Sequence, residues 1–289
     1  MCKRITVFLL TILLALTAAC PALANMAAPR PSDVGTSVTF EKNQDIAVTA
    51  ETLDIRVEGA KARIRAEYTM KNTAGEQIST PAMFLCPDQE EGSVQVTARE
   101  EPVEFTVEEY ALGYDSRVET KSWEYAVLSP DQLASPNEER VWAISFQLDF
   151  EPEEEYTVSV EYVYALGGYP EYDFDVKDGR IEYYLLPAAG WKDFGSLTIN
   201  LYLDKDMPVI ASSSLPFEKV GTRTYQYVSQ GLPEEELSVT IEENGFQKIF
   251  STLRNPYLRM MVLLLAPFVL VAAGVVLLVV LVRRKHKTK

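Results

Sequence analysis

The sequence is poor in the side chains that most enzymes use for proton transfer and metal binding. It contains one histidine, His286, which stands three residues from the C-terminus of a 289-residue chain. A Ser-His-Asp triad, a Cys-His pair and a histidine-ligated metal site are therefore excluded from the body of the protein. We expect no cofactor, no metal site and no enzymatic activity.

Cysteine is almost as scarce, with three residues in the chain: Cys2, Cys20 and Cys86. The first two lie in an N-terminal segment that we expect to be removed, so the mature chain cannot form an intramolecular disulfide. Exported eukaryotic domains of this size usually carry disulfides, and their absence favours a bacterial source. Cys86 follows Leu85 in an apolar run and is expected to be a core residue.

The N-terminal segment has the three parts of a secretory signal peptide. Lys3 and Arg4 precede an apolar run over residues 5–16, and Ala22-Leu23-Ala24 is a small-residue cleavage site. The apolar run is too short to span a hydrocarbon core of ~30 Å, so we expect cleavage after Ala24. An uncleaved anchor and a lipoprotein signal ending at Cys20 remain alternatives.

A second apolar segment, residues 260–282, has no charged side chain. A helix of that length rises ~34 Å and can span a bilayer. Five basic residues follow it, and their charge marks the cytoplasmic end: Arg283, Arg284, Lys285, Lys287 and Lys289. The pattern predicts a single-pass type I protein of the cell membrane with its N-terminal domain outside.

Negative charge is concentrated between the two apolar segments, where all 42 acidic residues lie. Two of the 27 basic residues belong to the signal peptide and five to the tail, so residues 25–259 carry a formal net charge of −22. A surface this acidic repels nucleic acid. The expected partners are the membrane and an extracellular protein or a cell-wall glycan.

The acidic segment alternates apolar and polar residues at period two over most of its length. Residues 46–58 and 62–70 are the clearest case, and Gly59-Ala60 between them predicts an antiparallel hairpin with one polar face. Similar strands follow at short intervals with few helical stretches. The pattern predicts an all-β fold of antiparallel sandwiches, Ig-like in the broad sense, plus one C-terminal transmembrane helix.

Changes in composition and turn-forming residues divide the chain into seven expected parts. The Gly167-Gly168-Tyr169-Pro170 segment suggests two tandem β-sandwich domains, with a single elongated sandwich as the alternative. The expected parts are a signal peptide (1–24), a flexible leader (25–35), a first sandwich (36–165), a second sandwich (166–245), a juxtamembrane linker (246–259), a transmembrane helix (260–282) and a basic cytoplasmic tail (283–289).

Asp173, Asp175 and Asp178 have part of the spacing of a calcium-binding loop. Lys177 stands at the fifth position, where it repels a cation, and Tyr184 stands at the twelfth, where such loops carry glutamate. A hairpin with Asp178-Gly179 in a type I′ turn is the interpretation that we favour. Calcium binding stays open at this point.

Short acidic runs stand beside proline or glycine in turn-like contexts. Paired carboxylates can hydrolyse glycosides, but in turns they are expected to be solvated. The runs are Glu90-Glu91, Glu100-Glu101, residues 153–155 and residues 234–236.

Trp191 and Phe194 stand in a loop before an alternating strand, residues 197–203. One interpretation makes the two rings a contact for a ligand or partner, for instance a stacking surface for a sugar. The other, which we favour, folds both rings over the end of the core.

Several segments carry a resemblance: Asn25-Met26-Ala27-Ala28-Pro29 and residues 38–43, 51–55 and 191–195. They resemble uncharacterised exported single-pass membrane proteins of Gram-positive, clostridia-like bacteria, and residues 40–87 are similar to a secreted bacterial domain of unknown function. The resemblance implies export and a β-rich fold, and it brings no catalytic residues. We expect a non-enzymatic binding or scaffolding module at the cell surface. The alternatives are a surface hydrolase using carboxylates or a Ser-Lys pair, and a structural subunit of another membrane protein.

Overall fold

The computed structural model describes residues 26–27, 29–31, 37–40, 42–113, 126–128, 140–268, 271 and 274. The expected signal peptide, the five basic residues of the tail and most of the apolar segment lie outside these ranges. Among the helices that are described, none combines the length and the apolar character that a membrane crossing needs.

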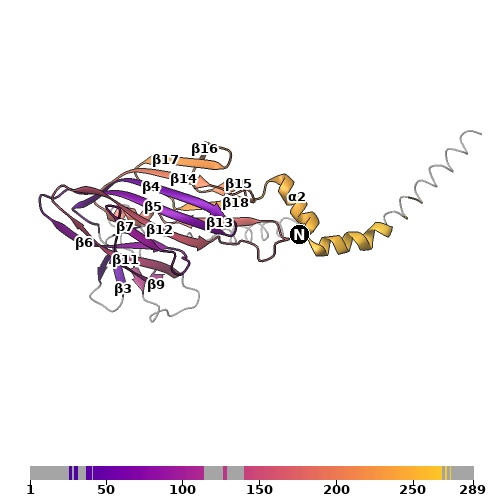
Figure 1. Cartoon of the computed structure of the whole chain (residues 1–289), viewed down its shortest axis with the longest axis horizontal. Helices are drawn as coiled ribbons and strands as arrows, with labels where there is room; N and C mark the ends of the chain where they lie inside the picture. Colours follow the sequence, from indigo (N-terminus) through magenta and orange to yellow (C-terminus); the bar gives the residue numbers. More distant parts are fainter. Residues whose placement is uncertain are drawn as a thin grey trace, which may run out of the picture.

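The described chain is mostly β-strand, arranged in three sheets that are antiparallel with one exception (Figure 1). This confirms the prediction of a β-rich, mainly antiparallel fold. The first sheet has the order β1 (Met26–Ala27), β6 (Ile78–Cys86), β11 (Arg140–Phe150), β9 (Phe105–Gly113), β10 (Ala126–Leu128), β3 (Ser37–Phe40) and β2 (Pro29–Pro31). The second has the order β16 (Glu218–Lys219), β17 (Thr224–Gln230), β14 (Phe194–Tyr202), β4 (Ile46–Glu58), β5 (Lys61–Asn72), β12 (Glu155–Ala165), β7 (Gln95–Ala98) and β8 (Glu101–Pro102). The third is β13 (Asp178–Tyr183), β18 (Leu237–Glu242) and β15 (Val209–Ser213).

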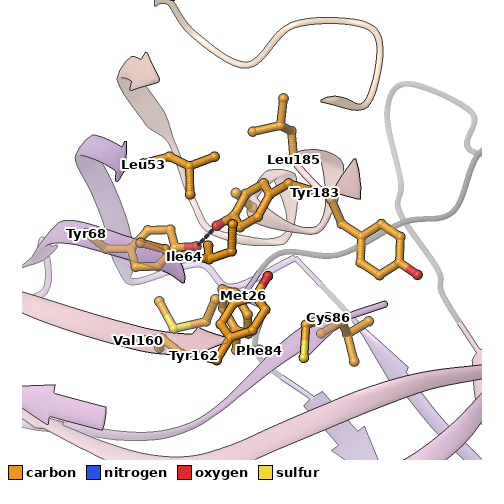
Figure 2. Packing of buried hydrophobic residues seen from close by; sticks show 14 of the residues in the cluster. Met26, Leu53, Ile64, Tyr68, Phe84, Cys86, Val160, Tyr162, Tyr183 and Leu185 are labelled. Carbon is orange, nitrogen blue, oxygen red and sulfur yellow. Dashed lines mark hydrogen bonds between the residues drawn. The ribbon is translucent and has the colours of Figure 1, made fainter. Parts of the chain in front are cut away.

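Side chains from all three sheets meet in one hydrophobic core (Figure 2). Phe84 of β6 is fully buried there, and its ring centroid lies 5.6 Å from that of Tyr162 of β12 and 6.1 Å from that of Tyr183 of β13. Cys86 is fully buried in the same cluster, as the sequence predicts. Alternation at period two places these apolar side chains on one face of each strand, which is why the sheets bury that face.

The hairpin of β4 and β5 is confirmed, with Gly59 in the left-handed region at φ 62° in the turn between them. Its register shifts between Val48 and Ala50, where Thr49 forms a bulge. The bulge reverses which positions face inward. Glu51 therefore points into the core in phase with Leu53 and Ile55.

The expected boundary at residues 165 and 166 falls within a sheet that continues across it. Strand β14, from the expected second sandwich, pairs in parallel with β4 from the first. The side chain of Asn200 also donates to Asp54 across this pair, at 2.8 Å. The two expected sandwiches thus share one sheet and one core.

The expectation of a flexible leader over residues 25–35 is wrong for the described part of that segment. Met26 and Ala27 are fully buried and pair with β6, and Pro29–Pro31 pairs with β3. The apolar side chain of Met26 is buried in the core at the edge of the sheet, and this burial favours the pairing of β1 with β6.

The expected juxtamembrane linker is largely helical. Helix α2 (Gly245–Arg254) begins at Asn244, whose side chain accepts from the backbone of Phe246 and Gln247 in a capping box. Residues 256–268 are also helical, after a break at Asn255.

Gly195 marks the closest approach of β14 to the β4 bulge. A Cβ atom at this position would lie 2.1 Å from the carbonyl oxygen of Thr49. We expect Gly195→Ala to lower the free energy of unfolding by ~1–3 kcal/mol, because the backbone must shift to relieve the overlap. Denaturant unfolding measures the loss, and Gly75→Ala is the matched control because that site is open. Equal stability of the two variants would contradict the β14–β4 pairing.

Candidate functional site

The Trp191 side chain lies in the core, 1% exposed, after the short 3₁₀ turn Leu186–Gly190. Its ring nitrogen donates to the Met26 carbonyl oxygen at 2.9 Å, which ties the loop to the N-terminal strand. Phe194 is partly buried and packs against the same core. A contact of Trp191 and Phe194 with a ligand or partner stays a prediction.

The aspartate-rich segment does not form the hairpin turn that its sequence predicts at Asp178-Gly179. Asp178 and Gly179 lie within β13, so the prediction of a turn there is wrong. A Cβ atom at residue 179 would come within 2.9 Å of the end of the Leu166 side chain, which packs over Gly179. Lys177 forms an ion pair with Asp206 at 2.7 Å. Within the described residues, no three His, Cys, Asp or Glu side chains are grouped so as to hold a metal ion.

Two of the acidic runs form ion pairs at the surface. Glu90 pairs with Lys61 at 2.6 Å, and Glu154 pairs with Arg99 at 2.7 Å. The hydrogen bond from Arg99 holds the pKa of Glu154 below its ordinary value. Such exposed pairs contribute little to stability.

Glu236, in the fourth run, contradicts the expectation of a solvated carboxylate because it is 7% exposed. Its Oε2 accepts hydrogen bonds from the backbone N–H groups of Leu185 and Leu186. Its Oε1 has no hydrogen-bond partner among the described residues. Burial raises the pKa of Glu236 to about 8, and the nearby charge of Glu51 acts in the same direction.

A second buried carboxyl group, Glu51, lies beside Tyr68 and Tyr183, and Tyr162 is buried in the same core. The Tyr183 hydroxyl donates to Glu51 Oε1 at 3.1 Å. It also lies 2.8 Å from the Tyr68 hydroxyl, and Figure 2 shows this hydrogen bond. Burial raises the pKa of Tyr68, Tyr162 and Tyr183 well above the ordinary tyrosine value. We call this group, with Glu236, the core carboxyl–tyrosine cluster.

The core carboxyl–tyrosine cluster is enclosed by strands of all three sheets. The Tyr162 hydroxyl has no hydrogen-bond partner among the described residues, which is costly inside a core. General acid–base chemistry requires a group within hydrogen-bond reach of a substrate. The cluster lies in the packed interior, so it is better suited to specifying how the sheets pack than to acting on a substrate.

A groove on the surface is lined by residues 89–94 together with side chains of β9 and β11. This groove has a volume of about 620 Å³ and includes Gln89, Glu91, Phe105, Val107 and Trp142 in its lining. We call it the Trp142 groove. Phe105 is exposed and Trp142 is half-buried, so two aromatic rings and a polar rim are available to a ligand.

A smaller pocket of about 380 Å³ adjoins the Trp142 groove and shares Glu91 and Gly92 with it. Its other side chains include Lys61, Arg63 and Ser93. The two hollows together offer aromatic faces, an amide and charges of both signs. This combination is typical of sites that orient a polar ligand by a few hydrogen bonds on an apolar floor. Sequence reasoning missed it, because its residues come from separate strands.

The chain matches no family model and no curated protein. Among solved structures, it is similar to a protein of Legionella pneumophila described as a putative nutrient binding protein, with 14% identity, a TM-score of 0.47, and coverage of 81% of this chain and 77% of that one. It also matches an M1 zinc metallopeptidase of Deinococcus radiodurans, with 9% identity, a TM-score of 0.30 and coverage of 68% of this chain. The chain spans 42% of that peptidase. Both likenesses are distant, and neither assigns a role to a residue of this chain.

Proposed function

We propose that the protein is a non-enzymatic binding module held at the outer face of a bacterial cell membrane. The observation that carries the binding role is the Trp142 groove, an open hollow of about 620 Å³ with aromatic rings and a polar rim. The buried carboxyl groups of Glu51 and Glu236 lie in the core and not in the groove. The groove is therefore the site for recognition, and the interior has a structural role.

The proposed anchor is the apolar segment over residues 260–282, whose first residues continue the helix that begins at residue 256. The expected signal peptide and the five basic residues of the tail support a type I topology. The β-structure then lies outside as an antiparallel sandwich.

We propose a cell-wall glycan as the ligand of the groove. Sugar rings present an apolar face that stacks on aromatic side chains, and their hydroxyls exchange hydrogen bonds with amides and carboxylates. Trp142 and Phe105 supply the rings, and Gln89 and Glu91 supply the polar groups. The acidic surface disfavours nucleic acid as a ligand.

Binding of the full-length protein, in detergent micelles, to purified peptidoglycan tests this proposal. We expect Trp142→Ala to weaken the binding roughly tenfold. The lost stacking contact is worth about 1 kcal/mol of binding free energy, and the lost burial of apolar surface adds to it. Tyr172→Ala removes an exposed aromatic ring outside the groove and should bind like the parent. Thermal melting confirms that both variants are folded. A parent that does not sediment with peptidoglycan, or a Trp142→Ala variant that binds equally well, would contradict the proposal.

A further inference from the structure

Helix α2 is joined to the β-structure through its polar side chains. Ser251 donates to Glu243 at 2.7 Å, and Gln247 donates to the carbonyl oxygen of Lys205 at 2.7 Å. Lys248 forms an ion pair with Glu242 at 2.6 Å. Ser251 is the buried residue of the helix. The polar face of α2 is thus the one that meets the protein.

The apolar side chains of α2 point the other way. They recur at spacings of three and four residues, which places them on one face of the helix. Each is more than half exposed: Phe246, Ile249, Phe250 and Leu253. A helix on a soluble domain normally buries its apolar face against the core. In α2 this polarity is inverted, so its apolar face needs a partner outside the described chain.

Other apolar groups gather at the same end of the molecule. The rings of Tyr172 and Phe174 stack with centroids 5.2 Å apart. Phe174 lines a hollow of about 430 Å³ with Tyr257 and Leu258, which lie in the second helix, after α2 and Asn255. Tyr257 is 73% exposed. The helix over residues 256–268 extends away from the β-structure at this end (Figure 1).

Charge distinguishes a lipid surface from a second copy of the chain. Helix α2 has no acidic residue, and Lys248 is paired with Glu242, so the basic groups left for a partner are Arg254 at its end and Arg259 shortly after it. The rest of the exposed segment is strongly acidic, so two copies repel each other. Basic residues beside an apolar face favour the headgroups of anionic lipids.

We propose that α2 lies in the headgroup layer of an anionic membrane, with its apolar face toward the acyl chains. Such helices place this face ~5–10 Å into the boundary between headgroups and acyl chains. Tyr172, Phe174 and Tyr257 form an aromatic belt beside it, as aromatic side chains do at membrane interfaces. The β-structure is then held close to the membrane in one orientation, with no flexible stalk. This inference rests on the proposed anchoring by residues 260–282.

Site-specific fluorescence in vesicles tests the position of α2. Full-length protein with Cys2→Ser, Cys20→Ser and Ile249→Cys, labelled with an environment-sensitive dye, is reconstituted into vesicles of phosphatidylcholine and phosphatidylglycerol. We expect the emission to shift to shorter wavelength and to be quenched by lipids brominated on their acyl chains. Val228→Cys is the matched control, because Val228 is equally exposed on β17. Its label should show neither effect, and the buried Cys86 should not be labelled.

Two outcomes separate failure of this inference from failure of the anchor. If alkaline carbonate leaves the protein in the vesicles but the label at residue 249 stays in water, the position of α2 is overturned and the anchor stands. If carbonate releases the protein, the proposed anchor fails. A shift that bromolipid does not quench and that disappears on diluting the protein among more vesicles would assign the face to a second copy, which also overturns the inference.

Discussion

Replacing Trp191 by alanine is expected to lower the free energy of unfolding by ~3–5 kcal/mol, because a large buried ring leaves a cavity. The ring is 1% exposed, and its nitrogen also donates to Met26. Loss of the ring therefore removes packing contacts in the core and also the hydrogen bond that holds the N-terminal strand β1. Since a whole domain is stable by only ~5–15 kcal/mol, the midpoint of denaturation by guanidinium should fall clearly.

Two further variants separate packing from hydrogen bonding. Trp191→Phe keeps most of the ring volume but removes the donor to Met26, so it should cost less than Trp191→Ala. Phe194→Ala should also cost less, because Phe194 is only partly buried. A Trp191→Ala protein as stable as the parent, but unable to bind peptidoglycan, would instead assign Trp191 and Phe194 to ligand contact.

The second large effect concerns pH, and Glu236 is its source. Burial raises the pKa of this carboxyl group to about 8 in the folded protein, whereas an unfolded glutamate titrates near pH ~4.3. Between these values the folded state holds a proton that the unfolded chain has lost. The stability contributed by this group is therefore complete below pH ~4.3 and falls as the pH rises toward 8, by up to ~1.4 kcal/mol per pH unit.

Glu236→Gln should remove this dependence. The amide oxygen can still accept from Leu185 and Leu186, and the side chain stays neutral at every pH. Relative to the parent, the variant should gain stability steadily from about pH 5 to pH 8, as measured by urea unfolding at each pH. Glu235→Gln, at the exposed neighbouring position, should follow the parent. Parallel curves for Glu236→Gln and the parent would show that Glu236 is ionised in the folded protein.

Local patterns predicted those elements whose partners are close in the sequence. The β4–β5 hairpin follows from alternation on both sides of Gly59. The same alternation indicates that Glu51 is buried, because it is an even number of residues from the apolar Leu53 and Ile55. The apolar Ile46 and Val48 are an odd number of residues from Leu53, so the inward-facing positions must switch between them. Such a switch within one strand indicates a β-bulge, which inserts one extra residue. A bulge between Val48 and Glu51 predicts that the Glu51 side chain faces the core.

Other features depend on distant segments, and no local pattern reports them. The parallel pairing of β4 with β14 joins strands far apart in the chain. The hydrogen bond from Trp191 to the Met26 carbonyl oxygen joins residues that are 165 positions apart. Glu236 looked like part of a solvated run because its neighbours Glu234 and Glu235 are exposed. Its burial depends on the backbone N–H groups of residues 185 and 186, which only the tertiary fold brings to it.

The parallel pairing also has a consequence for how the chain matures. Asp54 on β4 and Asn200 on β14 are 146 residues apart. At a synthesis rate of ~5–20 residues per second, β4 exists for roughly 7–30 seconds before the strand that covers its free edge has been made. An unpaired edge is a template for pairing with other chains. During that interval the early hairpin is vulnerable to aggregation, and a bound chaperone would shield the same edge that β14 later occupies.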